Sequence, residues 1–380
     1  MCSLSLNPRD KPEKPFEKSS GKAYIGLQAA SEVVIDLMKA ARLHEIGKGL
    51  SIDSIPVPKL GPGEVLVDVR GAGICHSDIH YCNGVGAVAK LPITLGHEIA
   101  GLVAETGDRT EGVEKGHRVL VHYVISCGTC RFCKTDREQY CRSYQMIGKT
   151  VDGGLAEYVA VPARNILKLP PNIPFEQAAI VGCAVSTAYH SLRRGRIGKG
   201  DVVVVCGVGG LGIHAVQLAH RIFEAKDVIA VDISEAKLKI AAKVGASLTV
   251  NAASEDPPER IKEFTDGELA DVVVDYVAQK RTVANAIRSI RMGGKVVLVG
   301  LSSDEIQLSP YQTIIGKEME MIGSDDHTGS ELRELIQLVE AGKLDLSGSV
   351  THTVKLEDVN RGLQILEGNI ENPIRIVVTR

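Results

Sequence analysis

The feature that most constrains the fold is an alternation of apolar strands and helical segments between residues 201 and 323. The candidate strands are 201–206, 228–231, 247–250, 272–275, 295–299 and 319–322. Helical segments separate most of them, beginning with an alanine-containing stretch over 211–225. Strands that are apolar on both faces belong in a parallel sheet covered by helices on both sides. Six such strands predict a doubly wound α/β sheet with the strand order 3-2-1-4-5-6.

A glycine-rich turn follows the first of these strands. The segment Gly207-Val-Gly-Gly-Leu-Gly212 fits G-x-G-x-x-G, and it lies between a predicted strand and a predicted helix, the context that gives this motif its meaning. Such glycines let the backbone approach a pyrophosphate, and the helix N-terminus then offers free N–H groups to it. The turn predicts a dinucleotide site made by Gly207, Gly209, Gly210, Leu211 and Gly212.

The residue that ends the second predicted strand indicates which dinucleotide binds. Asp232 follows Gly212 by 20 residues, the distance at which a carboxylate usually meets the adenosine ribose. A carboxylate there accepts hydrogen bonds from ribose hydroxyls and repels a 2′-phosphate, so we expect NAD rather than NADP. The alternative is a glycine turn beside an ordinary surface aspartate.

A cluster of cysteines precedes this region. Cys127, Cys130, Cys133 and Cys141 follow the spacing C-x2-C-x2-C-x7-C. Four thiolates at such spacing can surround one tetrahedral zinc ion, and a closed four-cysteine site is structural because it leaves no position for substrate. Two disulfides or four free thiols are the alternatives, and the lack of a secretory signal argues against the disulfides.

Composition narrows the class of protein. The 380 residues are enough for two domains, and the net charge of −3 offers no attraction for nucleic acid. No apolar run is long enough to span a bilayer, and residues 1–22 have no apolar core typical of a signal peptide. We expect a cytoplasmic protein that binds neither nucleic acid nor membranes.

The rest of the chain divides around the alternating region. Residues 1–37 read as an extension, with a candidate strand at Val33–Leu37. Residues 38–184 read as short strands and glycine-rich turns, and the clearest strands are 64–69, 99–103 and 118–122. After residue 323 the alternation ends, and we expect a helix over 331–342 and a strand over 374–378.

Three further residues could bind a second metal ion. Cys75, His97 and Cys183 would make a three-ligand zinc site with one position left for water or substrate. Their separation in sequence proves nothing by itself, and each alone is more often a buried core residue than a ligand. The dinucleotide motif and the cysteine cluster in the same chain favour the metal site.

Five motifs together give the chain a family resemblance. They are GICHSDIH around Cys75, LGHEIAG around His97, the cysteine cluster, GCAVST around Cys183 and VCGVGGLG at the dinucleotide turn. From Met38 to Arg380 the chain resembles the zinc-dependent medium-chain alcohol dehydrogenases, most closely the microbial NAD-dependent type.

The resemblance implies a fold and an assembly. It implies a β-rich, GroES-like catalytic domain that is discontinuous, over residues 38–184 and 324–380. A Rossmann dinucleotide-binding domain would lie between its two parts, over 185–323, and 1–37 would be an N-terminal extension. A homodimer or a homotetramer is implied as well.

The resemblance also implies a role for individual residues. Cys75, His97 and Cys183 would hold a catalytic zinc ion. Glu98 would lie behind this ion, Asp78 would orient His97, Ser77 would hydrogen-bond the substrate oxygen, and His80 would end a proton relay to solvent. Other residues would contact the cofactor: His76 and Arg375 at the pyrophosphate, Lys237 beside Asp232 at the ribose, and Thr187 and Val299 at the nicotinamide.

We therefore expect a two-zinc alcohol dehydrogenase that interconverts a primary or secondary alcohol and its aldehyde or ketone with NAD. A polyol or other hydroxy-compound dehydrogenase on the same scaffold is one alternative. A non-catalytic NAD-sensing protein is another. The identity of the alcohol stays open, although 4% aromatic residues and no tryptophan indicate a pocket with aliphatic walls.

Overall fold

The computed structural model describes residues 36–380. The candidate strand Val33–Leu37 lies outside the described residues except for its last two positions, and the first described strand, β1, is Leu37–Leu43. None of the described helices is both long enough and apolar enough to cross a membrane.

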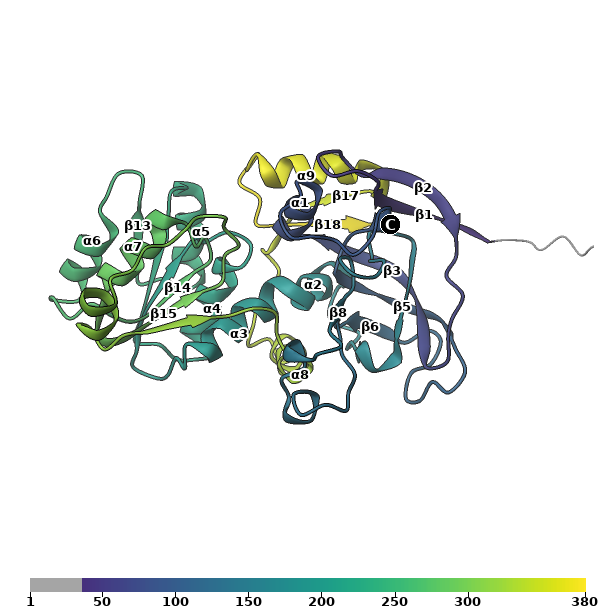
Figure 1. Ribbon diagram of the computed structural model, residues 1–380, viewed down its shortest axis with the longest axis horizontal. Helices are drawn as coiled ribbons and strands as arrows, with labels where there is room; N and C mark the ends of the chain where they lie inside the picture. The colour runs from purple at the N-terminus through teal and green to yellow at the C-terminus, as the bar shows by residue number, and fades with distance from the viewer. Residues whose placement is uncertain (1–35) are drawn as a thin grey trace, which may run out of the picture. The chain divides into compact units, whose positions relative to one another are not determined.

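A six-stranded parallel sheet occupies the region of alternating strands (Figure 1). Its strands are β11 Val202–Cys206, β12 Asp227–Asp232, β13 Leu248–Asn251, β14 Ala270–Asp275, β15 Ile290–Leu298 and β16 Glu320–Gly323. Their order across the sheet is β13-β12-β11-β14-β15-β16. The predicted order 3-2-1-4-5-6 is therefore confirmed, because β11 is the first strand of this series.

Helices cover both faces of this sheet, as the apolar strands predict. Val203 and Val205 of β11 belong to one hydrophobic cluster with side chains of the helices α3, α4 and α5. Val204 and Cys206 point the other way, into a second cluster with α6 and α7. This alternation is the period of two of a β-strand. The helices are α3 Ser186–Arg194, α4 Gly212–Arg221, α5 Glu235–Val244, α6 Pro257–Phe264 and α7 Lys280–Ser289.

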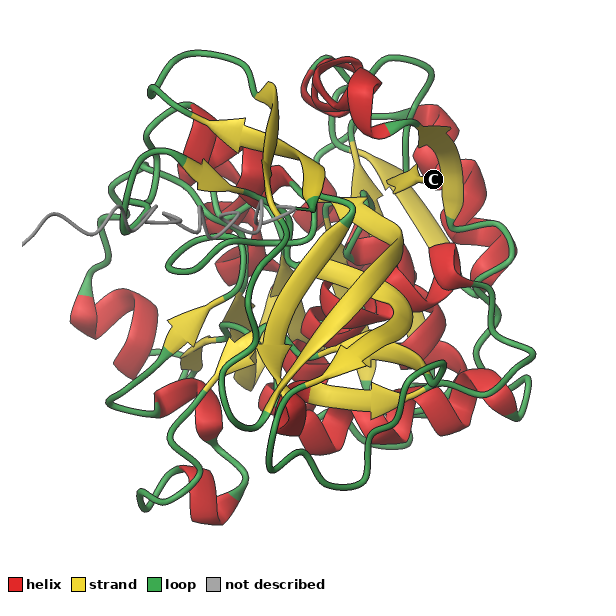
Figure 2. Cartoon of the chain, turned by 90° about the vertical axis from the view of Figure 1, so that its right-hand side faces the viewer, coloured by secondary structure: helices red, strands yellow, loops and turns green. Residues whose placement is uncertain are grey.

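A seven-stranded sheet joins the beginning and the end of the described chain. The order is β10-β6-β5-β3-β18-β17, with β9 also paired to β3. The strands are β3 Glu64–Ile74, β5 Glu98–Thr106, β6 Arg118–Val121, β9 Tyr158–Pro162, β10 Ile166–Lys168, β17 Val350–Val354 and β18 Arg375–Thr379. Strands and loops dominate this part of the molecule (Figure 2). Ile376 of β18 lies opposite Ile74 of β3, so residues about three hundred positions apart share one core.

Shorter elements complete the fold. Two small sheets are β2-β1-β4, with β2 Ser51–Pro56 and β4 Ile93–Thr94, and β7-β8, with β7 Val124–Ile125 and β8 Gln145–Met146. The remaining helices are α1 His76–Cys82, α2 Phe175–Ile180, α8 Gly329–Glu340 and α9 Val359–Glu367. Single turns of helix are η1 Cys133–Thr135, η2 Glu138–Tyr140, η3 Ala163–Asn165, η4 Val181–Val185, η5 Pro310–Ile315 and η6 Leu356–Asp358.

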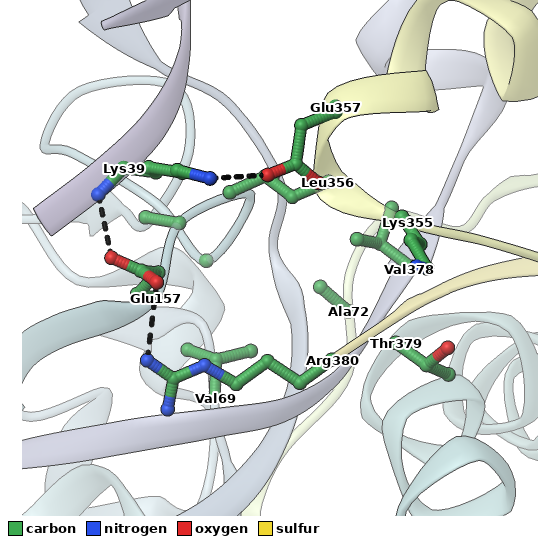
Figure 3. Close-up of a pocket in the computed structure, with 12 residues that line it drawn as sticks. Lys39, Val69, Ala72, Glu157, Lys355, Leu356, Glu357, Val378, Thr379 and Arg380 are labelled. Atoms are coloured by element: carbon green, nitrogen blue, oxygen red, sulfur yellow. Dashed lines mark hydrogen bonds and ion pairs between the residues drawn. The ribbon is translucent and has the colours of Figure 1, made fainter. Parts of the chain in front are cut away.

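A pocket of about 220 Å³ lies between β1 and the segment around β18. Figure 3 shows two ion pairs in its lining: Lys39 Nζ lies 2.7 Å from Glu357, and Arg380 lies 3.3 Å from Glu157. None of its lining residues belongs to the glycine turn or to a predicted metal site, and we assign no ligand to it.

Two buried histidines make the stability of the fold depend on pH. Burial lowers the pKa of His122 to about 4 and, with the nearby Arg375, that of His214 to about 3. The ordinary pKa of histidine in an unfolded chain is about 6.5, so below this pH the unfolded chain takes up protons that the folded chain excludes. The stability that these two neutral histidines contribute is therefore fully present above pH 6.5 and is lost as the pH falls toward their folded-state pKa values.

We expect His214→Leu to lessen this loss. Between pH 7.5 and 5.0 the wild-type chain should lose about 2 kcal/mol more unfolding free energy than the variant, from 1.5 pH units at about 1.4 kcal/mol each. Urea unfolding at the two pH values measures the difference. Equal losses in the two proteins would show that His214 does not stay neutral in the folded chain.

Candidate active site and metal centres

The glycine turn has the conformation that a dinucleotide site requires. Gly207 has a φ of +83°, which disfavours a side chain there. A Cβ at Gly212, the first residue of α4, would lie 1.9 Å from the carbonyl oxygen of Gly207, so only glycine fits this close approach of turn and helix. A Cβ at Gly209 would enter open space. The backbone at Gly209 is therefore free to meet a ligand, as a pyrophosphate-binding turn must be.

Asp232 stands at the edge of a pocket beside this turn. The pocket has about 300 Å³, and its lining includes Gly207, Asp232, Ala252 and Val277. Both carboxylate oxygens of Asp232 accept backbone hydrogen bonds, from Val208 N–H at 2.8 Å and from Ser234 N–H at 2.9 Å. The carboxylate therefore shapes the glycine turn, and it also lines the pocket.

The three separated candidate ligands come together in the folded chain. Cys75 follows β3, His97 precedes β5, and Cys183 lies in the π-helical turn η4, a wider turn that often marks functional sites. Their sulfur and nitrogen atoms and a carboxylate oxygen of Glu98 all lie within 4.8 Å of one another, and all four residues are buried.

The electrostatics of this cluster suit a bound cation. The hydrogen bond from Cys183, assisted by His97, lowers the pKa of Cys75 well below its usual value. Burial opposes a charge on His97, yet the neighbouring Cys75 thiolate raises its pKa to about 9. Zinc binds thiolates and neutral imidazole, so a metal ion at this buried donor set would replace the proton that His97 otherwise holds.

Glu98 has a buried cationic partner. Arg375 of β18 donates to Glu98 Oε1, and the two side chains are 1% and 0% exposed. A Cβ at Gly73 would lie 1.9 Å from Glu98 Oε2, so a glycine on β3 makes the room for this carboxylate. Arg375 also contacts the glycine turn, since a Cβ at Gly210 would lie 2.9 Å from its Nη1. Arg375 thus lies between the metal cluster and the dinucleotide turn.

The short helix α1 carries the other predicted residues of the first motif. Asp78 is fully buried and accepts hydrogen bonds from Cys75 N–H at 2.9 Å and Gly96 N–H at 3.2 Å. Its Oδ1 lies 4.0 Å from His97 Nδ1, and burial raises its pKa to about 6. Ser77 Oγ lies 3.7 Å from Cys75 Sγ. Ser77 and His80 are half-buried and His76 is exposed.

The predicted nicotinamide and ribose residues lie on three different elements. Thr187 is buried on α3, and its hydroxyl lies 3.9 Å from Cys183 Sγ. Val299 follows β15 and donates its N–H to Asp275 O at 3.0 Å. Lys237 is half-buried on α5, where burial lowers its pKa and Asp232 partly offsets that effect. The structure brings Thr187 to the metal cluster and Lys237 to Asp232.

The four clustered cysteines form a second group of donors. Their sulfur atoms lie within 4.8 Å of one another, with Cys127–Cys133, Cys130–Cys133 and Cys130–Cys141 separations of 3.8, 3.5 and 3.9 Å. Tetrahedral zinc with Zn–S bonds of about 2.3 Å sets sulfur atoms about 3.8 Å apart. Backbone N–H groups point at the sulfur atoms, such as Cys130 N–H at 3.3 Å from Cys127 Sγ. The four thiols fit a zinc ion closely.

Comparison with known proteins agrees with this geometry. The profile described as the alcohol dehydrogenase GroES-like domain matches residues 61–171, and the profile described as zinc-binding dehydrogenase matches 210–341. An alcohol dehydrogenase of Geobacillus stearothermophilus is 36% identical over 344 residues, which cover 90% of this chain and 100% of the relative. The chain belongs to the zinc-type medium-chain alcohol dehydrogenase family.

Other members of the family match as much of the chain. A protein named NAD-dependent alcohol dehydrogenase from Sulfurisphaera tokodaii is 36% identical over 87% of this chain and 96% of its own length. The crystal structure of the alcohol dehydrogenase from Aeropyrum pernix superposes with a TM-score of 0.83 at 34% identity, covering 90% of this chain and 100% of that one. The doubly wound fold, predicted from the alternating strands and helices, and the GroES-like part, implied by the family resemblance, are therefore confirmed.

Two residues near the cluster of Cys75, His97 and Cys183 were not predicted as site residues. His327 is fully buried, with Nδ1 3.0 Å from Ser186 Oγ and its ring 4.9 Å from that of Tyr123. Asp326 accepts a hydrogen bond from the Tyr123 hydroxyl at 2.9 Å. The only signal in the sequence is three adjacent titratable residues, Asp325, Asp326 and His327, shortly after the edge strand β16.

Proposed function

We propose that the protein is an NAD-dependent alcohol dehydrogenase with one catalytic and one structural zinc ion per chain. It interconverts a primary or secondary alcohol and the corresponding aldehyde or ketone. The observation that carries this proposal is the convergence of Cys75, His97 and Cys183, whose donor atoms lie within 4.8 Å of one another. A glycine turn and an aspartate suited to a dinucleotide lie in the same chain.

Two observations support NAD as the cofactor. Relatives from Sulfurisphaera tokodaii and Saccharolobus solfataricus carry the name NAD-dependent alcohol dehydrogenase. The Asp232 carboxylate would accept hydrogen bonds from ribose hydroxyls and repel a 2′-phosphate. Gly207, Gly209, Gly210, Leu211 and Gly212 are the proposed pyrophosphate turn.

We propose that Cys75, His97 and Cys183 hold the catalytic zinc, and that Cys127, Cys130, Cys133 and Cys141 hold the structural one. When bound at the three-ligand site, zinc supplies Lewis acidity that lowers the pKa of an alcohol hydroxyl. Asp78, 4.0 Å from His97 Nδ1, would orient this ring from behind, as metal-bound histidines commonly require. Glu98 would lie behind the metal, where burial raises its pKa to about 7 and the pairing with Arg375 opposes that rise.

The proton released from the alcohol needs a route to water. Ser77 stands beside Cys75, and its hydroxyl would hydrogen-bond the substrate oxygen. His80 lies one helical turn further along α1, on the same side as Ser77. We propose that Ser77 Oγ would receive the proton and that the His80 imidazole, at the end of the relay, would release it to solvent.

The remaining proposed roles concern cofactor position. Thr187 lies on α3 beside Cys183, and Val299 follows β15. These two residues would flank the nicotinamide. Lys237 would support the ribose beside Asp232. His76 and Arg375 would face the pyrophosphate, and the contact of Arg375 with Gly210 supports its part of this assignment.

We further propose a division of the chain and an assembly. Residues 38–184 and 324–380 form the catalytic domain, 185–323 form the dinucleotide domain, and 1–37 are an extension. The pairing of β18 with β3 supports the discontinuous domain. Leu301, Tyr311 and Ile315 are 57–75% exposed, and they follow β15 and precede the edge strand β16. This apolar surface supports a homodimer or homotetramer, which sedimentation velocity distinguishes.

We also propose a cytoplasmic location. The cysteines among the described residues are free of disulfides, and sites built from thiolates persist in a reducing compartment.

NADH formation by the purified protein tests the function. Primary, secondary, aromatic and polyhydric alcohols are each supplied with NAD, with NADP, and with NAD after zinc chelation. Turnover of simple alcohols with NAD that the chelator abolishes is the expected result. A preference for polyols would indicate that the protein is a polyol dehydrogenase. NAD binding without turnover on any alcohol, with zinc present, would favour a non-catalytic NAD-sensing protein.

A further inference from the structure

The cysteine loop, residues 127–141, holds the beginning of helix α8. Its two acidic residues are Asp136 and Glu138. Gly329 N–H donates to Glu138 Oε1 at 2.6 Å. The Thr328 hydroxyl lies 3.4 Å from Asp136 Oδ2, and the Ser330 hydroxyl donates to the same oxygen. These contacts join parts of the chain about 190 residues apart. Through them, each carboxylate of the loop accepts a hydrogen bond from the beginning of α8.

The residue just before this helix start reaches the catalytic metal ligands. His327 Nδ1 lies 3.0 Å from Ser186 Oγ, and Ser186 Oγ donates to the carbonyl of Cys183 at 3.1 Å. On its other side, His327 packs edge-on against Tyr123, whose ring centroid lies 5.1 Å from that of His97. His327 therefore lies between Ser186 and Tyr123. These two residues contact Cys183 and His97, which are two of the three catalytic ligands.

The cysteine loop cannot hold its own shape by burying apolar groups. The turns η1 and η2 contain no buried residue. Among residues 36–380, the hydrophobic clusters include no member from 126 to 140. Asp136 comes three residues after Cys133, and Glu138 three residues before Cys141. The folding of the cysteines around their metal ion therefore decides where both carboxylates stand.

We propose that Asp136 and Glu138 are positioning residues that link the cysteine loop to the catalytic metal site. They fix the segment Asp326–Ser330, and His327 in this segment holds Ser186 and Tyr123 against the segments that carry Cys183 and His97. The proposal rests on the assignment of Cys75, His97 and Cys183 as metal ligands under the proposed function. The cysteine loop thus contributes to the affinity and geometry of the second metal site as well as to stability.

Cobalt at the catalytic site tests this link without relying on turnover. The full-length chain keeps zinc in the cysteine loop, verified by metal analysis, and receives Co²⁺ at the Cys75–His97–Cys183 site. Competition with a chelator gives the Co²⁺ affinity, and the visible absorption reports the ligand geometry. The variant D136A/E138A removes both acceptors, and D136N/E138Q keeps a carbonyl oxygen at each position. The variant K134A is the matched control, because Lys134 lies on the same loop and its side chain makes no hydrogen bond or ion pair with the described residues of α8.

We expect D136A/E138A to bind Co²⁺ about tenfold more weakly with a shifted spectrum, the size of effect seen when outer partners of metal ligands are removed. D136N/E138Q should recover wild-type affinity to within about threefold, and K134A should match the wild type. A D136A/E138A protein with unchanged Co²⁺ affinity and spectrum would overturn the proposal, even if it melts at a lower temperature.

Two further results keep the test decisive. If D136A/E138A does not fold, S330A removes the contact with Asp136 from the helix side, and an unchanged Co²⁺ spectrum there would count against the link. A wild-type chain with both zinc ions that oxidises no alcohol would refute the proposed function, while the cobalt comparison among variants would still stand.

Discussion

Replacement of Cys75 by alanine is expected to lower alcohol oxidation by at least about a thousandfold, which corresponds to about 4 kcal/mol of lost transition-state stabilisation. Cys75 is one of the three residues that would bind the catalytic zinc, and it lies in a buried cluster where water cannot easily replace the thiolate. Zinc content should fall from two ions to one per chain, because the four-cysteine group lies elsewhere. Metal analysis and NADH formation measure the two effects.

The control for this variant is another buried cysteine, Cys82, which ends the helix α1 that begins directly after Cys75. Cys82 is 8% exposed and belongs to neither group of metal donors. Cys82→Ala should retain two zinc ions and activity within about threefold of the wild type, since it loses a small apolar contact only. A Cys75→Ala protein that keeps both zinc ions and its activity would refute the catalytic site.

The second large effect concerns the choice of cofactor. Asp232→Asn should lower the ratio of kcat/KM for NAD over NADP by about 10²–10³, because it removes a charged hydrogen-bond acceptor for the ribose and the repulsion of a 2′-phosphate. Kinetics with both cofactors measure this ratio. Asp227→Asn, at the other end of β12, is the matched control and should leave the ratio unchanged.

The hydrogen bonds of Asp232 predict a second effect of Asp232→Asn, in addition to the loss of charge. Its two carboxylate oxygens each accept a backbone N–H, from Val208 and Ser234, and asparagine offers only one oxygen. One of these N–H groups should lose its partner, at a cost of about 1–3 kcal/mol. Activity with NAD should therefore fall more than activity with NADP rises. A variant with full NAD activity and no change in the ratio would contradict the assignment.

The sequence could predict the features that depend on residues close together in the chain. The order of β11 to β16 follows from apolar strands separated by helices, and the structure confirms it. The four cysteines lie within 15 residues, so their spacing alone indicates a metal site. Cys75, His97 and Cys183 are far apart, so their grouping depended on the other two motifs in the chain and on the family resemblance rather than on their spacing.

The contacts between distant polar residues could not be predicted in this way. Glu98 and Arg375 are 277 positions apart, and nothing in their local sequence shows that both are buried. His327 stands in a polar segment, Ser-Asp-Asp-His-Thr, that is typical of a surface loop, yet tertiary packing covers it completely. The contacts of Asp136 and Glu138 with α8 depend on how the metal-bound loop folds, which no residue pattern encodes.

The discontinuous sheet has a consequence for the order of folding. Cys75, His97 and Cys183 all precede the six-stranded sheet in the chain, whereas Arg375 follows it on β18. The six-stranded unit is built from neighbouring strands and helices and can form early, but β18 must close a loop of about 300 residues to reach β3. We therefore expect Cys75, His97, Cys183 and Glu98 to come together in a folding chain before Arg375 arrives. Until β18 docks, Glu98 lacks its buried cationic partner.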